Sequence, residues 1–185
     1  MNQYLEHFLN SKGNRDLIFQ DVLNSFSGKP ISILEIGAAR NLDSYSRMAD
    51  GWSSLHYYNY IKQNGGSLTI CDISDSSISN CKKLFENLTD GVDINFVLAD
   101  GNNLIDNKYD LIYLDGGDDP RDMVTQLSKI NFNSQKILCD DFHTKGSIAR
   151  SIFPNFTLYK WQGHDHEMAF YRHNYRGTIF CNTIQ

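Results

Sequence analysis

Apolar residues in the first 28 positions recur with the three- and four-residue spacing of helices, in two groups that are separated near Gly13. The apolar positions of the two groups are Tyr4, Leu5, Phe8 and Leu9, then Leu17, Ile18, Val22, Leu23 and Phe26. The segment SFSGKP then ends the helical pattern. We therefore expect two short helices within residues 1–28, ahead of the first strand.

Beyond residue 30, short apolar runs alternate with helical patterns. Five runs predict strands: ISILEIG, SLTICDIS, INFVLAD, YDLIYLD and QKILCDD. Helical spacing occupies WSSLHYYNYIKQ, the segment that follows a cap at Ser74 or Asp75, and PRDMVTQLSKI, which opens with Pro120. Continuous apolar strands that alternate with amphipathic helices are typical of a parallel sheet covered on both faces.

The C-terminal part departs from this alternation. FTLYKWQ, HEMAFYRH and GTIFCNT predict consecutive strands joined by short polar turns. The fold prediction is therefore an α/β protein with a Rossmann-like, doubly wound and mostly parallel sheet that ends in an antiparallel hairpin. With 185 residues, of which 41% are hydrophobic, the chain is large enough for one core, so we expect a single domain over residues 1–185.

Composition and charge exclude several classes of function. No stretch approaches about 18 uninterrupted apolar residues, and the first residues lack the layout of a signal peptide, so we expect a soluble, cytoplasmic protein without membrane contact. The net charge is −5 and there is no basic run, which argues against nucleic acid as a partner. The cysteines (Cys71, Cys81, Cys139 and Cys181) are widely spaced, so we expect free thiols rather than a zinc site or a disulfide framework.

The acidic residues are unevenly divided, since 18 of the 22 are Asp and only 4 are Glu. An acidic residue lies at the end of every predicted parallel strand. These residues are Glu35, Asp72, Asp100, Asp115 and the pair Asp140 and Asp141. Each of them alone is explained as a cap or a turn residue. The carboxyl ends of parallel strands, however, meet at one edge of the sheet, where carboxylates repel one another unless a ligand or a cation uses them.

The glycine turn after the first strand narrows the choice of ligand. A carboxylate at the end of the second strand, next to such a turn, binds the ribose hydroxyls of NAD or of S-adenosylmethionine. A dinucleotide pyrophosphate requires the pattern G-x-G-x-x-G, whereas the turn from Gly37 to Leu42 contains one glycine. The turn therefore favours a cofactor without phosphate groups.

The motifs LEIGAAR, GWSS, LTICDIS, FVLADG, DLIYLDGG and ILCDDFH follow one another in this order. Together they resemble the class I S-adenosylmethionine-dependent methyltransferases. Within that class they are most similar to the small-molecule O-methyltransferases of the catechol type and their bacterial relatives. The resemblance covers residues 31–143 and implies a methyltransferase-like domain with S-adenosylmethionine as cofactor.

The resemblance implies roles for most of the strand ends. The cofactor-binding residues that it implies are Glu35, Gly37, Ala38, Ser53, Asp72, Ile73, Asp100, Gly101 and Asp115. The first two would lie beside the methionine portion of the cofactor, and Ser53 would contact the cofactor carboxylate. Asp72 would bind the ribose hydroxyls, while Asp100 and Gly101 would lie along the adenine edge. Asp115 would sit beneath the sulfonium at the centre of the site.

The sequence departs from the family pattern at two points. Residues 41–51 are an insertion, which either covers the cofactor, presents substrate contacts through Arg40, Tyr45 or Arg47, or forms a solvated loop. The metal-dependent relatives also have a catalytic lysine shortly after the fourth-strand aspartate, where this chain has Asp118.

In the metal-dependent relatives, a divalent cation at the last strand ends lowers the pKa of the bound substrate hydroxyl. The matching candidates for Mg²⁺ or another divalent cation are Asp115, Asp140 and Asp141. The catalytic candidates are Asp115, Asp141 and His143. His143 is either a general base or a loop histidine bonded to a nearby carboxylate. We interpret His164–Glu167 as a hairpin turn rather than a metal cluster.

The sequence therefore predicts a methyltransferase that uses S-adenosylmethionine to methylate a hydroxyl, or less favourably an amine, of a small molecule, with or without a divalent cation. Two alternatives stay open. One is an NAD(P)-dependent oxidoreductase, which shares the ribose carboxylate, and the other is a non-catalytic binding module with a methyltransferase-like fold. The methyl acceptor and the oligomeric state are not predicted.

Overall fold

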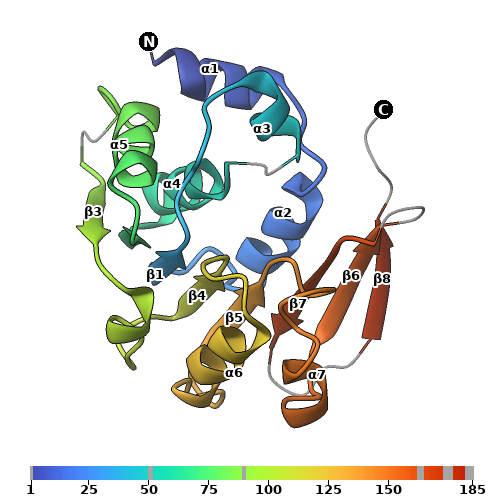
Figure 1. Ribbon diagram of the computed structural model, residues 1–185. Helices are drawn as coiled ribbons and strands as arrows, with labels where there is room; N and C mark the ends of the chain where they lie inside the picture. Colours follow the sequence, from blue (N-terminus) through green and yellow to red (C-terminus); the bar gives the residue numbers. More distant parts are fainter. Residues whose placement is uncertain (1, 50–51, 89–90, 162–164, 173–176, 182–185) are drawn as a thin grey trace.

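The computed structural model describes residues 2–49, 52–88, 91–161, 165–172 and 177–181. Strands in these residues form one mixed sheet in the order β3-β2-β1-β4-β5-β7-β6-β8 (Figure 1). The strands are β1 (Ile31–Ile36), β2 (Gly66–Asp72), β3 (Asp93–Leu98), β4 (Leu111–Leu114), β5 (Lys136–Cys139), β6 (Thr157–Trp161), β7 (Glu167–Tyr171) and β8 (Gly177–Cys181).

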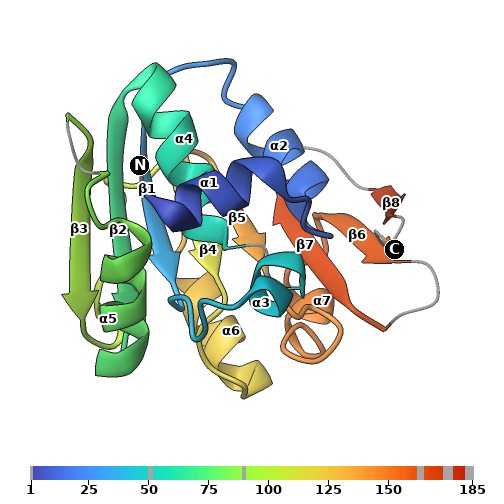
Figure 2. The ribbon, with the colours of Figure 1, turned by 90° about the horizontal axis from the view of Figure 1, so that it is seen from above.

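Helices cover both faces of the sheet. They are α1 (Gln3–Asn10), α2 (Asp16–Asn24), α3 (Ser44–Ala49), α4 (Ser53–Asn64), α5 (Asp75–Leu84), α6 (Pro120–Ser128) and α7 (Ala149–Ile152), together with the 3₁₀ turn η1 (Gly101–Asn103). Neighbouring residues of β1 show the alternation: Ile33 packs into the core shared with α1, α2 and α4, whereas Leu34 packs with α6 and α7 on the other face. Figures 1 and 2 show the first group of helices on one side of the sheet and α6 on the other.

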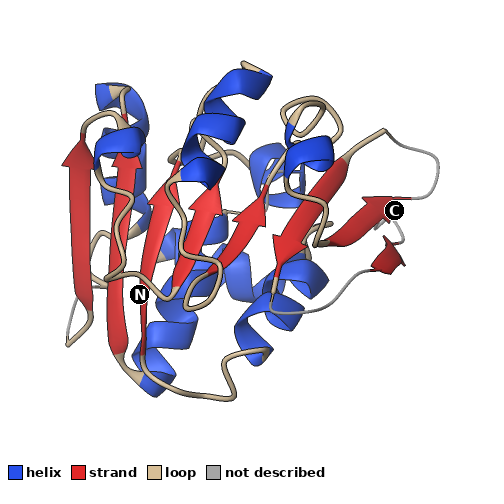
Figure 3. Ribbon diagram, turned by 90° about the horizontal axis from the view of Figure 1, so that it is seen from below, coloured by secondary structure: helices blue, strands red, loops and turns tan. Residues whose placement is uncertain are grey.

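The predicted fold class is confirmed. Strands β1 to β5 pair in parallel, and β7 runs antiparallel to both β5 and β6 (Figure 3). One detail differs from a run of consecutive hairpins, because β8 pairs in parallel with β6, from Thr157 opposite Gly177 to Trp161 opposite Cys181. Since β5 and β6 already occupy both edges of β7, β8 cannot pair with β7 and instead pairs with the free edge of β6.

The predicted helix starts agree with the structure. Two helices, α1 and α2, precede β1 and are separated by a turn that contains Gly13. The side chain of Ser74 caps α5 by accepting the Ser77 N–H, and Pro120 opens α6 after a cap at Asp119. These ends depend on contacts within a few residues, which is why the sequence pattern predicts them.

The inserted segment 41–51 contains the short helix α3, and residues 50–51 lie outside the described part. From α3 the Arg47 guanidinium reaches Asp16 at the start of α2, with N–O distances of 2.8 and 2.9 Å. It also donates to the carbonyls of Phe8 and Ser11, and its side chain is 1% exposed. The insertion is therefore fastened to the N-terminal helices.

The cysteine prediction is confirmed, because the four thiols are free, three of them buried and Cys181 half-buried. Within the described residues, the structure contains no helix with the length and apolar character needed to cross a membrane.

Candidate functional site

A cleft of about 770 Å³ lies at the carboxyl ends of β1 to β4. The strand order reverses here, because the chain passes from β3 at the edge of the sheet to β4, which lies on the other side of β1. This volume lies within the range of small-molecule sites. The predicted cofactor residues that line the cleft are Gly37, Ala38, Asp72, Ile73, Asp100, Gly101 and Asp115. The topology thus brings together side chains that are separated by up to 78 positions in the sequence.

The loop after β1 passes unusually close to the loop after β4. Gly37 has a φ of 100°, and a Cβ there would lie 2.9 Å from the carbonyl carbon of Asp115. A larger residue would push the two loops apart. The glycine is therefore required for the narrow base of the cleft.

The Asp72 carboxylate is held at the rim of the cleft by two main-chain groups. The Ala38 N–H donates to Oδ2 at 2.8 Å, and the Ser74 N–H donates to Oδ1 at 2.8 Å. Each carboxylate oxygen has further acceptor capacity, since a carboxylate offers about four lone-pair sites. Asp72 can therefore accept bonds from a vicinal diol without losing its own support.

The adjoining strand end supplies a flat and partly apolar wall. Asp100 caps η1 by accepting the Asn102 N–H at 2.9 Å, and a Cβ on the buried Gly101 would lie 2.5 Å from a methyl group of Ile36. Ile73 on the neighbouring loop is 79% exposed. An exposed isoleucine in a polar cleft is a ready contact for a flat ring system.

Glu35 is fully buried beneath the loop after β1. The Ser53 hydroxyl donates to one carboxylate oxygen, and the Ser54 hydroxyl donates to the other at 2.5 Å. Burial, which outweighs these two bonds, raises the pKa of Glu35 to about 7. Glu35 thus ties β1 to the start of α4 and does not line the large cleft, while Ser53 lines a smaller cavity next to it.

This second cavity, of about 170 Å³, shares Gly37, Ala38, Arg40 and Asp115 with the large cleft. Its other lining residues are Arg15, Ala39, Asn41, Trp52, Ser53, Asp140 and Asp141. Asp115 stands between the two cavities. Arg40 also lines both cavities.

Two other predicted contacts in the insertion do not reach the site. Arg47 is buried against Asp16, as described above, because an arginine in the core needs a carboxylate partner. Tyr45 is 73% exposed and lines neither cavity.

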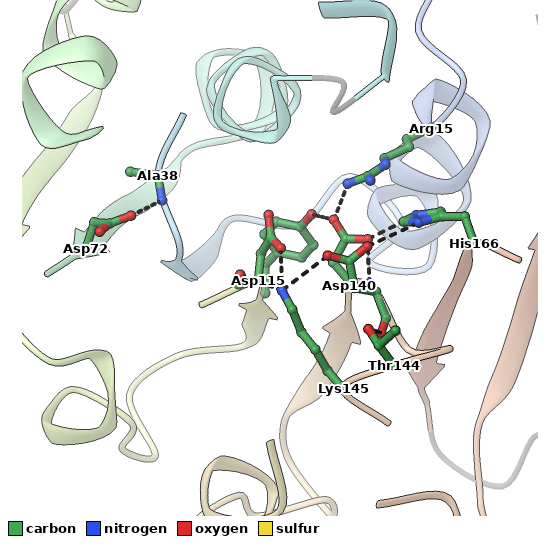
Figure 4. A network of polar contacts seen from close by, with 10 residues as sticks. Arg15, Ala38, Asp72, Asp115, Asp140, Thr144, Lys145 and His166 are labelled. Atoms are coloured by element: carbon green, nitrogen blue, oxygen red, sulfur yellow. Dashed lines mark hydrogen bonds and ion pairs between the residues drawn. The ribbon is translucent and has the colours of Figure 1, made fainter. Parts of the chain in front are cut away.

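Asp115, Asp140 and Asp141 follow the ends of β4 and β5 and pair with cationic side chains. Figure 4 shows Asp115 and Asp140 with Arg15, Lys145 and His166 around them. Lys145 places its Nζ atom 2.9 Å from the Asp115 carbonyl oxygen and 3.1 Å from Asp115 Oδ1. The same atom is 3.3 Å from Asp141 Oδ2. Burial, followed by the charge of Asp140, raises the pKa of Asp115 above its usual value.

Asp140 is the most enclosed of the three carboxylates. Its Oδ2 accepts hydrogen bonds from the Arg15 guanidinium and from the Tyr113 hydroxyl, the latter at 2.7 Å. Its Oδ1 accepts the Asp141 N–H at 2.8 Å and lies 3.2 Å from His166 Nε2. Burial alone would raise the pKa of Asp140, but the charge of Arg15 and the contact with His166 outweigh burial and hold it well below its usual range.

His166, which the sequence did not single out, lies beside these carboxylates together with His143. The His166 Nδ1 lies 3.2 Å from Asp141 Oδ1, whereas the buried Nδ1 of His143 has no hydrogen-bond partner among the described residues. The two imidazole rings are 5.4 Å apart. Among the described residues, Asp141, His143 and His166 form a group whose potential ligand atoms lie within 4.8 Å of one another.

The segment interpreted as a hairpin turn does connect β6 to β7, although His164 lies outside the described residues. Glu167 starts β7 and pairs with Arg150 and Lys160, away from the cleft.

Sequence reasoning missed four residues of the site: Arg15, Tyr113, Lys145 and His166. Arg15 is 125 positions from its partner Asp140, so no local pattern reveals the pair. Lys145 is the exception, because it follows Asp141 at the i, i+4 spacing of an ion pair.

No protein-family model matches the chain, and no curated protein matches it. Solved structures do share its fold. The SAH-bound methyltransferase PaMTH1 of Podospora anserina is 16% identical, with a TM-score of 0.60 over 94% of this chain and 89% of the other.

Two further structures extend the comparison. Magnesium protoporphyrin IX methyltransferase (ChlM) from Synechocystis PCC 6803, solved with bound SAM, is 12% identical, with a TM-score of 0.57 over 85% of this chain and 78% of that chain. The ribosomal protein L11 methylase from Lactobacillus delbrueckii subsp. bulgaricus is 16% identical, with a TM-score of 0.58 over 84% and 77%.

The names of these proteins specify a porphyrin in one case and a ribosomal protein in another, so the shared fold does not select the catechol type. What the three comparisons have in common with this chain is the fold. This chain has the fold of the class I S-adenosylmethionine-dependent methyltransferases.

Proposed function

We propose that this protein is a methyltransferase that moves a methyl group from S-adenosylmethionine (SAM) to a hydroxyl group of a small molecule. The observation that carries the proposal is the position of Asp115, whose carboxylate stands between a cofactor-sized cleft and a smaller polar cavity. The two cavities accommodate a donor and an acceptor on either side of one proton-accepting group.

The residues of the large cleft fit SAM. Asp72 presents free acceptor sites for the two ribose hydroxyls while its main-chain bonds to Ala38 and Ser74 hold it in place. Ile73 and Gly101 offer an apolar contact and a flat approach for the adenine ring. The loop from Gly37 to Leu42 contains one glycine and suits a ligand without a pyrophosphate, which disfavours NAD(P).

On the acceptor side, Asp115 would accept the proton of the substrate hydroxyl. SAM supplies the electrophilic methyl group. The raised pKa of Asp115 suits a proton acceptor that works near neutral pH, because a general base is most effective when its pKa is close to the working pH. Lys145 contacts the Asp115 carboxylate and helps to fix the position of the base, while Arg15, Tyr113 and His166 keep the neighbouring Asp140 ionised and in place.

A divalent cation is not part of this reaction as we propose it. Asp115, Asp140 and Asp141 are adjacent, but Lys145, Arg15 and Tyr113 already occupy oxygens that Mg²⁺ would need. The three carboxylates do not present an open set of ligands.

The proposal is tested by incubating the purified protein with methyl-labelled SAM and three panels of acceptors: phenols, aliphatic alcohols and primary amines. We expect label to transfer to one of the two hydroxyl panels, the phenols or the alcohols. Asp115→Asn should lower the rate by about 10²-fold or more while the variant still binds S-adenosylhomocysteine (SAH). Asp106→Asn changes an exposed aspartate outside the cleft and should leave the rate unchanged.

The same assay separates the alternatives. Transfer only to the amine panel would contradict the hydroxyl acceptor, and binding of NAD(P) without binding of SAH would contradict the cofactor. Binding of SAH with no transfer to any panel would favour a non-catalytic binding module.

A further inference from the structure

We propose that the ammonium group of Lys145 stands in the place of a divalent cation between Asp115 and Asp141, so that the acceptor side of the site works without a metal. The role of Lys145 in catalysis rests on the proposed function. Its competition with a metal ion does not, and can be tested by itself.

Three oxygens surround the Lys145 ammonium. The Asp115 carbonyl, Asp115 Oδ1 and Asp141 Oδ2 lie 2.9, 3.1 and 3.3 Å from Nζ. An ammonium group has three protons to donate, so this set satisfies it. The side chain is 7% exposed, which means that the charge has little access to water and depends on these oxygens.

The third carboxylate is not available to a cation either. Both oxygens of Asp140 are occupied, one by Arg15 and Tyr113 and the other by the Asp141 N–H, with His166 close by. Mg²⁺ requires near-octahedral coordination by oxygen. An ion placed among these carboxylates would also meet the charges of Lys145 and Arg15 at short range, where repulsion is strong.

The main chain fixes Lys145 in this position. Its N–H donates to the Asp141 carbonyl at 2.9 Å, closing a turn that begins at a residue with a φ of 46°. The next residue, Gly146, packs so closely on Phe142 that a Cβ would lie 2.4 Å from the ring. Lys145 therefore belongs to a tightly built turn rather than to a loose surface loop.

The position has a chemical consequence. Lys145 lines the large cleft and holds Asp115, the residue that stands between this cleft and the acceptor cavity. The ammonium charge offsets the negative charge that Asp115 and an ionising acceptor hydroxyl bring together, which a cation otherwise does. The acceptor class that profits is a hydroxyl with an accessible anion, such as a phenol.

The test is a calorimetric titration of MgCl₂ into the wild type and into Lys145→Met, which keeps the length of the side chain and removes the charge. We expect no saturable Mg²⁺ binding to the wild type. Lys145→Met should bind Mg²⁺ with an affinity at least about tenfold above the upper limit measured for the wild type. Adding Asp141→Asn to Lys145→Met should abolish the new site. Lys108→Met removes an exposed lysine that pairs with Asp106 and should behave as the wild type.

Circular dichroism, measured on every variant, shows that each is folded without relying on the proposed function. Saturable Mg²⁺ binding to the wild type that Asp141→Asn removes would overturn the proposal. So would a Lys145→Met protein that is folded but does not bind Mg²⁺. In the activity assay, EDTA should leave the wild type unaffected, and added Mg²⁺ should restore part of the rate that Lys145→Met loses.

Discussion

The two halves of the site treat the same kind of residue in different ways. On the cofactor side, Asp72 and Asp100 accept hydrogen bonds from main-chain N–H groups, including those two residues further along the chain. On the acceptor side, Asp115 and Asp140 face cationic side chains that lie 30 and 125 positions away. Main-chain bonds leave a carboxylate open to a ligand, whereas a cationic partner balances its charge and occupies its oxygens. The strand end alone therefore does not decide what an aspartate does.

The largest effect is expected at Arg15, the buried partner of Asp140. We expect Arg15→Met to lower the free energy of unfolding by about 3–5 kcal/mol, because it leaves a carboxylate buried without its counter-charge. Urea denaturation measures the change. Arg121→Met is the matched control, since Arg121 pairs with Asp119 on the exposed surface, and its unfolding midpoint should equal that of the wild type. Equal midpoints for all three proteins would contradict the buried pair.

The second-largest effect is expected at Glu35. Burial raises the pKa of Glu35 from 4.5 to about 7. Between these values the folded state binds a proton that the unfolded state releases, so the contribution of Glu35 to stability falls as the pH rises. We expect the unfolding free energy of the wild type, relative to Glu35→Gln, to decrease by up to about 1.4 kcal/mol per pH unit in this window. Denaturation at pH 5, 6 and 7 checks it. A constant difference between the two proteins would show that Glu35 titrates normally.

The smallest effect is expected at Ile73 on the cofactor side. Its side chain is 79% exposed and would be covered by a bound adenine. Ile73→Ala should weaken SAH binding by about 1 kcal/mol or less and leave the unfolding free energy unchanged. Leu17→Ala removes a similarly exposed side chain, 73% exposed on α2, and should change neither quantity. A loss of stability without a loss of affinity would place Ile73 in the core rather than at the ligand.

The success of the sequence-based predictions also differs between the two sides of the site. Strand positions, the cap at Ser74 and the start of α6 at Pro120 depend on local periodicity and local hydrogen bonds, and these predictions are confirmed. The cleft residues on the cofactor side follow as well, because the strand order places Asp72, Asp100 and Asp115 at one edge.

The partners on the acceptor side could not be predicted in this way. Arg15 reaches Asp140 only because α2 packs over β4 and β5, and Arg47 pairs with Asp16 only because α3 docks on the N-terminal helices. Periodicity says which face of a helix is buried, but not which distant carboxylate a buried arginine will meet. The exception, Lys145, has its local spacing from Asp141 as a signal.

One measurement compares the two sides of the site most directly: calorimetric titration of SAH into the wild type, Asp72→Ala and Asp141→Asn, with Asp75→Ala as a control just outside the cleft. Asp72 offers two charge-assisted hydrogen bonds to the ribose, so we predict that Asp72→Ala weakens SAH binding by at least about 10²-fold. Asp141 lines only the smaller cavity, so Asp141→Asn and Asp75→Ala should bind SAH within about threefold of the wild type. Wild-type affinity in Asp72→Ala, or a loss in Asp141→Asn as large as that predicted for Asp72→Ala, would contradict the account.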